Sequence, residues 1–329
     1  MIHEPKSTRT HWQLKFIALA LIWGSSFLLM KFGLLALDPV QIAAVRIGCG
    51  ALILVVLLHL TGDRLPREPR TWFHLMVSAV FLSALPFTLF ALGETRVSSA
   101  LAGIGNSITP VAMVVAGLFL LPSERVTRAK LFAVALGFIG VIVISEPWAV
   151  LTRPDPVGFA IVLAAGTCYG IGWPYLRRHL AAVDLGGLSQ PAALLLCGTV
   201  LMVPVTLIWW WLHRDVVATP WSVHAAAGSR ALWGGVLATL VLGLVGTGLA
   251  YMLQYDVVRD AGTVVSSTVT YLIPVVSVVL GVLVLDEHLG IFQLLGFVLV
   301  LSAALIVGRP ATGWGALLAR ARPPAATSD

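Results

Sequence analysis

The sequence predicts an all-α polytopic membrane protein, with ten transmembrane helices as two inverted five-helix repeats. The chain of 329 residues is 58% hydrophobic and only 11% charged, whereas about 25% of the residues in a soluble domain are charged. Long apolar runs alternate with short charged segments, as in helical membrane proteins. The two halves of the chain also share motifs. The low charged fraction and the long apolar runs exclude a soluble enzyme, a secreted disulfide scaffold and a nucleic-acid-binding domain.

Ten runs of mostly apolar residues have the length of about 20 residues that crosses the hydrocarbon core of a bilayer. The predicted spans are residues 14–36, 39–60, 71–92, 97–121, 129–147, 157–178, 188–212, 232–255, 262–285 and 289–308. The expected organisation is a cytoplasmic N-terminal segment (1–13), a first repeat (14–147), a second repeat (148–308) and a cytoplasmic disordered tail (309–329). No cleavable signal peptide is expected, because the first run is long and contains Lys31.

The placement of basic residues predicts the orientation. If the N-terminus is cytoplasmic, fifteen basic residues fall in the inner segments: Lys6, Arg9, Lys15, Arg64, Arg67, Arg70, Arg125, Arg128, Lys130, Arg177, Arg178, Arg259, Arg309, Arg320 and Arg322. The outer loops then hold four, which are Arg96, Arg153, Arg214 and Arg230. The positive-inside rule therefore places both termini in the cytoplasm. This placement explains the net charge of +6, so no nucleic-acid partner is expected.

Short motifs recur in the same order in both halves. The pairs are Gly105–Pro110 with Val269–Pro274, Trp23-Gly24 with Tyr169-Gly170, and the acidic turns that contain Glu124 and Glu287. Each half is a five-helix unit, and an odd number of spans makes the second unit enter the membrane from the opposite side. Inverted repeats are typical of secondary transporters, whose halves move around a midplane site. The alternative is an ancestral duplication without alternating access.

These motifs resemble the EamA-like family of the drug/metabolite transporter superfamily. The resemblance rests on Trp23-Gly24-Ser25-Ser26-Phe27 with Lys31, on Arg46, on the Thr109-Pro110 and Ile273-Pro274 steps, and on Glu124 and Glu287. It covers nearly all of residues 12–308. It implies a carrier that exports small metabolites, often amino acids or drugs, across a bacterial cytoplasmic membrane, without fixing the substrate. Leu194 stands near the place where Arg46 would recur, so a role for Arg46 is confined to the first repeat.

Lys31 and Arg46 are the two charged side chains well inside the predicted spans. At a rise of 1.5 Å per residue, both lie about 10 Å below the outer surface. Charges within a membrane are costly and are functional candidates by default. We therefore expect Lys31 and Arg46 to attract an anionic group of the substrate, such as a carboxylate. For both side chains the alternative is snorkelling toward the outer headgroups or pairing with Glu94.

A second set of candidates is uncharged and lies beside Pro110 and Pro274, which free backbone carbonyls. The candidates for hydrogen bonding a substrate are Asn106, Thr109, Tyr251, Gln254, Ser266, Ser267, Thr270 and Tyr271. The candidates for an aromatic wall are Trp23, Tyr169 and Trp173. The alternative for each Ser and Thr is contact between helices, and for each Trp it is the interfacial belt.

Absent motifs narrow the mechanism. The sequence has no Walker A run, no catalytic cluster and no metal-ligand spacing, so neither enzymatic activity nor a cofactor is expected. No carboxylate lies at the centre of a span, which favours facilitated diffusion or exchange over ion coupling. Glu124 and Glu287 are expected to be N-terminal charges of the helices that follow them. The partners are then a small-molecule substrate and the lipid bilayer, for a monomer or homodimer.

Other function classes remain as alternatives. The nearest is an anionic-metabolite or nucleotide-sugar-type exchanger of the same superfamily, which needs further cations in the cavity, such as Arg177. A channel and an intramembrane enzyme are less well supported. Channel filters are usually built from several subunits, and an enzyme needs a clustered catalytic set that the sequence lacks.

Overall fold

The computed structural model describes residues 11–121, 128–149, 154–183, 185–224, 228–261 and 269–308. In these residues every regular element is a helix and there is no strand, so the all-α prediction is confirmed.

In the first half, the first four predicted spans are helices and three of them are interrupted. The elements are α1 (His11–Gly24), α2 (Ser26–Gly33), α3 (Pro39–Thr61), α4 (Pro69–Ala79), the π-helix η1 (Val80–Ala84), α5 (Leu85–Glu94), α6 (Ser99–Asn106), α7 (Thr109–Leu120) and α8 (Arg128–Ser145). Local sequence sets several of the ends. Asp38 and Pro39 begin α3, and Gly62 ends it with a positive φ of 75°, a conformation that glycine adopts at no steric cost.

The second half also has a π-helix in its third helical segment, whereas its first helix, α9, is continuous. Its elements are α9 (Pro156–Leu180), α10 (Ser189–Leu212), α11 (Gly228–Gly243), the π-helix η3 (Leu244–Leu249), α12 (Ala250–Ala261), α14 (Val269–Leu285) and α15 (Ile291–Gly308). Helix α9 begins like α3, with Pro156 in its first turn and the Asp155 carboxylate accepting a hydrogen bond from the Gly158 N–H at 2.6 Å. These N-terminal caps satisfy backbone donors that the helix itself leaves free.

The apolar helices identify a membrane protein. Within the described residues, seven helical segments are long and apolar enough to cross a membrane, and three shorter apolar helices accompany them, at Leu131–Ser145, Val269–Leu285 and Ile291–Ile306. Large apolar side chains also cover the outside of the bundle, including Phe119 and Leu283, each 76% exposed. Water disfavours so much contiguous apolar surface, whereas lipid tails accept it.

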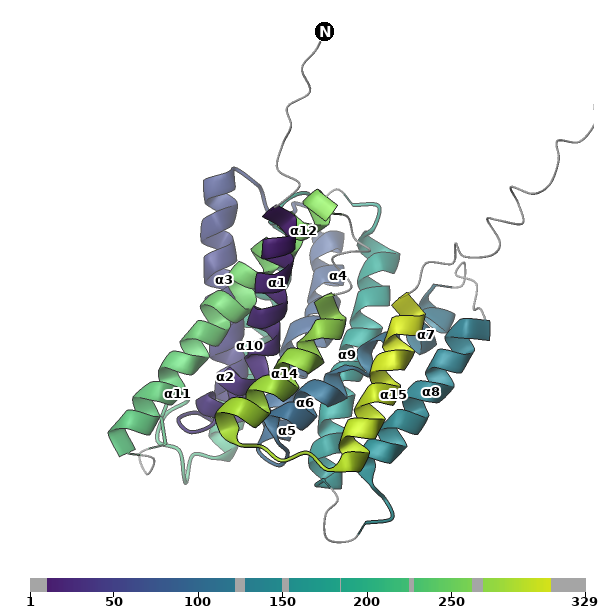
Figure 1. Cartoon of the computed structure of the whole chain (residues 1–329). Helices are drawn as coiled ribbons and strands as arrows, with labels where there is room; N and C mark the ends of the chain where they lie inside the picture. The colour runs from purple at the N-terminus through teal and green to yellow at the C-terminus, as the bar shows by residue number, and fades with distance from the viewer. Residues whose placement is uncertain are drawn as a thin grey trace, which may run out of the picture.

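The two halves are packed into each other rather than side by side. Helix α3 packs on α10, α6 on α14, α2 on α11, α8 on α15, and both α5 and α7 on α9 (Figure 1). Helices α8 and α15 meet through glycines. A Cβ atom built on Gly296 would lie 2.6 Å from the Gly140 carbonyl oxygen, so these two backbones touch and admit no side chain.

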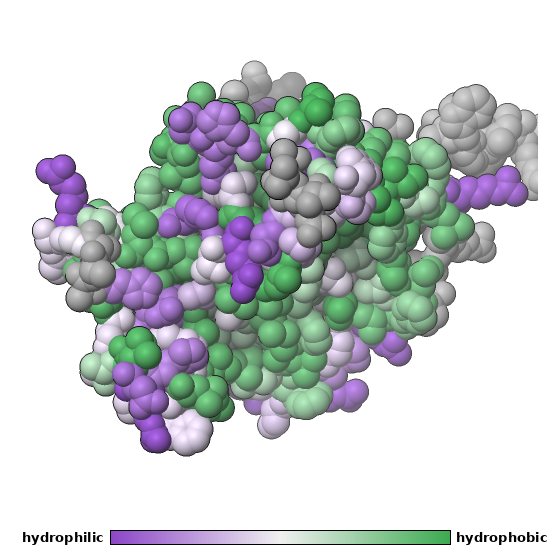
Figure 2. Space-filling model, turned by 90° about the horizontal axis from the view of Figure 1, so that it is seen from below, coloured by the Kyte–Doolittle hydropathy of each residue, from purple (hydrophilic) through white to green (hydrophobic). Residues whose placement is uncertain are grey.

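The bundle has two ends, which we name from the course of the chain. The proximal end holds the start of α1 and the ends of α7, α9, α12 and α15 (Figure 1). The distal end holds the turns at residues 34–38, 95–98, 146–149, 213–224 and 286–290. Seen from the distal end, hydrophilic residues form patches among hydrophobic ones (Figure 2).

Candidate binding cavity

A cavity of about 620 Å³ lies inside the bundle between the two halves. Ten of the thirteen site residues expected from the sequence line it: Trp23, Arg46, Asn106, Thr109, Tyr169, Trp173, Tyr251, Gln254, Thr270 and Tyr271. Lys31 is not among the lining residues, and Ser266 and Ser267 lie outside the described residues. The structure therefore brings together side chains from both halves.

The cavity extends from the middle of the bundle to the proximal end. Its deepest lining residues include Phe27, Met30 and Phe90, of which Met30 is only 1% exposed. Its other lining residues include Leu121, just after α7, and Arg177, in the last turn of α9, and both helices end at the proximal end. The cavity therefore leads to the end of the molecule at which α1 begins.

Arg46 is a buried cation in the cavity wall, with 7% of its surface exposed. Its Nε donates a hydrogen bond to the Thr247 hydroxyl at 3.0 Å, and its guanidinium carbon lies 3.8 Å from the centroid of the Phe87 ring. Among the described residues no carboxylate forms an ion pair with it. A buried charge without a counter-ion is costly. Arg46 thus provides a position at which an anionic ligand group would be stabilised.

The π-helix η3 presents Thr247 to this arginine. The Thr247 hydroxyl donates to the Leu242 carbonyl at 3.2 Å, five residues earlier, and this leaves the hydroxyl oxygen to accept from Arg46. Small neighbours allow the approach, because a Cβ atom on Gly50 would lie 2.7 Å from the Thr247 methyl carbon. π-Helical turns within α-helices are frequent at functional sites. Here the widened turn fixes the orientation of the guanidinium.

Aromatic rings form the walls on either side of Arg46. Trp23 and Tyr251 pack edge to face with ring centroids 6.3 Å apart, and Phe27 and Phe90 do so at 5.3 Å. Tyr169 extends the second pair, its ring centroid 6.0 Å from that of Phe90. These geometries are the favourable ones for aromatic pairs. The cavity thus combines apolar walls with one buried cation, a composition suited to an amphipathic ligand.

Asn106 and Thr109 flank the interruption between α6 and α7. The Thr109 hydroxyl donates to the Gly166 carbonyl of α9 at 3.0 Å, so this side chain also serves the helix contact that was the alternative for it. Asn106 is half-buried and lines the cavity. Pro110, in the first turn of α7, lacks the N–H that would continue α6. The break therefore places polar groups at the wall.

Lys31 lies in a different environment from Arg46, although the two side chains were expected to act together. Its ammonium donates to the carbonyl oxygens of Glu94, at 2.6 Å, and Val97, at 2.9 Å. These carbonyls belong to the end of α5 and the turn after it. Lys31 thus pairs with the backbone of Glu94 rather than with its carboxylate, and it stabilises a helix C-terminus.

Other polar contacts fasten the distal end. The Glu287 carboxylate accepts hydrogen bonds from the backbone N–H of Ser99 at 2.7 Å and of Ala100 at 2.8 Å. The expectation for Glu287 was wrong in one respect: it serves the N-terminus of α6, far away in sequence, instead of that of α15. The Ser277 hydroxyl adds a hydrogen bond to the Ser99 carbonyl at 3.0 Å. Helices α6 and α14 are therefore joined where the cavity is closed.

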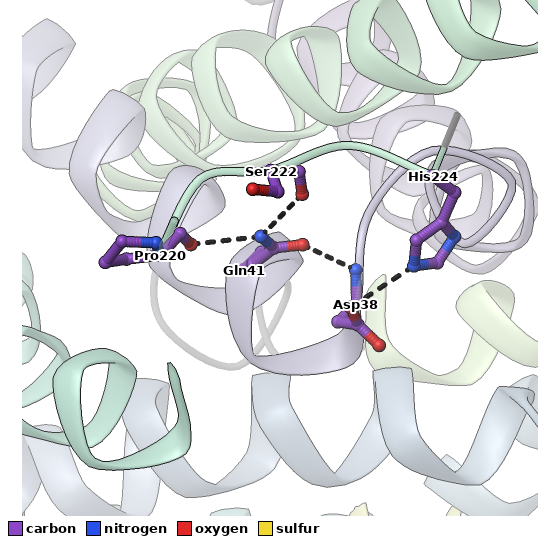
Figure 3. Close-up of polar contacts among 5 residues, drawn as sticks. All are labelled: Asp38, Gln41, Pro220, Ser222 and His224. Atoms are coloured by element: carbon purple, nitrogen blue, oxygen red, sulfur yellow. Dashed lines mark hydrogen bonds and ion pairs between the residues drawn. The ribbon is translucent and has the colours of Figure 1, made fainter. Parts of the chain in front are cut away.

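A second distal contact ties the 213–224 segment to the start of α3 (Figure 3). The buried Gln41 amide donates to the carbonyls of Pro220 at 3.0 Å and Ser222 at 2.9 Å, and its oxygen accepts from the Asp38 N–H at 2.8 Å. His224 lies 3.2 Å from the Asp38 carboxylate. This network covers the distal end of α3, the helix that carries Arg46.

Several lining residues were missed by sequence reasoning. Phe87, Phe90, Met30 and Thr247 line the cavity but were not among the candidates. Only Thr247 had a detectable signal, since it stands between Gly246 and Gly248 in an otherwise apolar run. In the part of the chain described, no group of three His, Cys, Asp or Glu side chains is placed to hold a metal ion.

An apolar helical bundle with a half-closed central cavity defines the class as a membrane protein with an internal binding site. The chain belongs to the EamA-like transporter family, whose model matches it twice, at residues 10–146 and 156–309. It is similar to an uncharacterized transporter of Archaeoglobus fulgidus, with 27% identity over 90% of this chain and 99% of that protein. It is also similar to the uncharacterized inner membrane transporter YedA of Escherichia coli, with 24% identity over 88% of each.

The fold has a counterpart among solved structures. A crystal structure of a protein 19% identical in sequence superimposes with a TM-score of 0.58, over 91% of this chain and 99% of that one. At this identity the likeness concerns the fold alone. The family and the fold together establish a membrane transporter.

Proposed function

We propose that this protein is a secondary transporter with ten transmembrane helices in two inverted repeats, which moves small metabolites by alternating access. The observation that carries the proposal is the cavity, which is lined by both halves, leads to the proximal end and is closed distally by Lys31 and Glu287. A carrier caught facing one side has this arrangement. The three shorter apolar helices complete the ten spans.

The positions of η1 and η3, the π-helices in the described part of the chain, support the repeat. Both η1 and η3 interrupt the third span of their half. Each packs against a helix of the other half, η3 on α3 and η1 on α10. Helices α3 and α10 are the second spans of the two halves. Each half therefore sets its second helix against the π-turn of the other, as expected for related units that exchange roles during transport.

The substrate we propose is a small amphipathic molecule with a carboxylate, such as an amino acid. Its carboxylate would supply the counter-ion that Arg46 lacks. Charge-assisted hydrogen bonds to guanidinium are among the strongest in proteins. Its apolar body would pack on Trp23, Tyr169 and Tyr251. In this proposal the proximal end faces the cytoplasm, transport is export across the inner membrane, and the protein works as a monomer or homodimer.

Facilitated diffusion or exchange fits the cavity, because no Asp or Glu is found among its lining residues in the described part of the chain. The alternative, an exchanger of anionic metabolites or nucleotide sugars, is favoured by one observation: Arg177 lines the cavity as well as Arg46. A substrate with two anionic groups would use both arginines.

Expression in a host sensitive to toxic amino-acid analogues and amphipathic drugs tests the proposal. Resistance that requires Arg46 and applies to carboxylate-bearing compounds supports it. Resistance to cationic drugs alone, unchanged in Arg46→Gln, contradicts the substrate class. An alkaline-phosphatase fusion to the C-terminus that is active outside the membrane contradicts the orientation.

A further inference from the structure

Glu94 is a buried carboxyl group that the transport site does not use. It is the last residue of α5, it is 0% exposed, and neither of its carboxyl oxygens has a hydrogen-bond partner. It does not line the cavity. The sequence placed it at the end of a span, where contact with water would be ordinary, so its complete burial is a finding of the structure.

Three charged side chains act on the Glu94 carboxyl: Lys31 from α2, Arg46 from α3 and Glu287 from the turn after α14. Each has other partners. Lys31 donates to the carbonyls of Glu94 and Val97, Arg46 to Thr247, and Glu287 accepts from the backbone of α6. The cations therefore lie near the carboxyl without forming an ion pair with it.

The nearest charged residue along the chain, Arg96, pairs with Asp155 and not with Glu94. Arg96 lies 3.6 Å from Asp155 at the start of α9, and their side chains are 50% and 36% exposed. This pair faces solvent at the distal surface. An ionised carboxylate without partners or water is far more costly to bury than a neutral carboxyl.

We propose that Glu94 is a proton-binding site that controls closure of the distal end. When the distal end is closed, the carboxyl is sealed from water and holds a proton. When α6 separates from α14, water reaches Glu94, the proton leaves to the distal side and the carboxylate pairs with the Lys31 ammonium. Acid on the distal side then favours the closed conformation. The inference rests on the alternating access of the proposed function.

The site regulates the carrier without driving it. Because Glu94 lies off the cavity, a proton taken up on distal closure has no route to the proximal end and returns to the side from which it came. This agrees with facilitated diffusion or exchange. The closed state binds one more proton than the open state, so the ratio of closed to open protein changes by up to about tenfold per pH unit.

Double electron–electron resonance spectroscopy on the purified full-length chain tests whether protonation of Glu94 controls distal closure. Spin labels are attached at Thr95→Cys and His288→Cys, which are exposed on the two distal turns flanking the Glu287 contact, with the three native cysteines replaced by alanine. Between about pH 8 and about pH 5 we expect a longer label-to-label distance to give way to the short one of the closed state. The distances need no substrate, so the test remains readable if the transport proposal fails.

Two variants make the test specific. Glu94→Gln imitates the protonated carboxyl and is expected to show the short distance at every pH. The matched control is Glu146→Gln, another buried distal carboxyl with one unpartnered oxygen, on the α8–α15 side of the bundle; it should follow the unmodified protein. A pH response unchanged in Glu94→Gln, or absent from the unmodified protein, overturns the proposal.

Should Glu94→Gln fail to fold, infrared spectroscopy of the unmodified chain gives the answer directly. The closed protein is expected to show the carbonyl stretch of a protonated carboxyl, and Glu94→Asp, which keeps a titratable group, should retain both this band and the pH response. Absence of the band from closed protein contradicts the proposal.

Discussion

Replacing Arg46 should separate ligands by their charge. The guanidinium is buried, its Nε donates a hydrogen bond to Thr247, and its carbon lies over the Phe87 ring. In Arg46→Gln an anionic ligand loses a charge-assisted hydrogen bond in a site shielded from water, which costs about 1.5–3 kcal/mol. This corresponds to a rise in Kd of roughly 10- to 150-fold.

Arg46→Lys keeps the charge but loses the planar fork and the hydrogen bond to Thr247. We expect it to recover only part of the affinity, because the two side chains are not equivalent at a stacked site. Thr247→Val removes the acceptor for Nε while leaving the arginine in place. Its loss should be smaller than that of Arg46→Gln, about 1 kcal/mol for one hydrogen bond.

The assay is calorimetric binding of two ligands of matched shape to the purified protein, 3-phenylpropionate and its neutral amide. Arg46→Gln should weaken the carboxylate by the stated factor and change the amide by less than about threefold. Equal losses for both ligands would show that Arg46 supports the cavity structurally. No loss for either would refute the reasoning that an anion completes this site.

Three further predictions follow from the contacts. Lys31→Met removes the donor to two carbonyls at the end of α5. It should lower Tm by several degrees through the loss of about 1–3 kcal/mol, while leaving phenylpropionate affinity within about threefold. An unchanged Tm with a large loss of affinity would show that Lys31 belongs to the binding site. Gly103→Ala should destabilise by about 1–3 kcal/mol, because its Cβ would lie 2.2 Å from the Ser277 hydroxyl; Gly48→Ala, with nothing within 4 Å, is the matched helix control and should raise thermal stability slightly, so equal effects in a thermal-shift assay would contradict the packing. Trp23→Ala removes a cavity wall and its contact with Tyr251; it should weaken both ligands alike, by about 2 kcal/mol or more, and calorimetry showing a loss for the carboxylate alone would contradict its role as an apolar wall.

The membrane class, and many of the residues that line the cavity, could be predicted from the sequence for a physical reason. A bilayer penalises every polar group it buries, so the few polar residues within apolar runs are conspicuous. Asn106, Gln254 and Thr270 were found in this way, and they line the cavity. Trp23 and Tyr169 were found because they recur at related places in the two halves.

What the sequence could not provide was the pairing of groups that lie far apart along the chain. Lys31 and Arg46 have similar depth and composition around them, yet one meets backbone carbonyls and the other Thr247. Which partner each cation meets depends on how α2 and α3 pack against α5 and η3. The π-helix that presents Thr247 has no clear sequence signature either. Nor could position alone show that Glu94, at the end of a span, is sealed from water.

A carrier opens its cavity alternately to each side of the membrane. Counterflow in proteoliposomes tests it most directly: vesicles loaded with unlabelled phenylalanine are diluted into a trace of the labelled compound, with and without the Arg46→Gln substitution. The account predicts transient accumulation of label above its equilibrium level in the unmodified protein, and little or none in the variant. Uptake that rises only to equilibrium, without saturation and accompanied by single-channel currents, would contradict it.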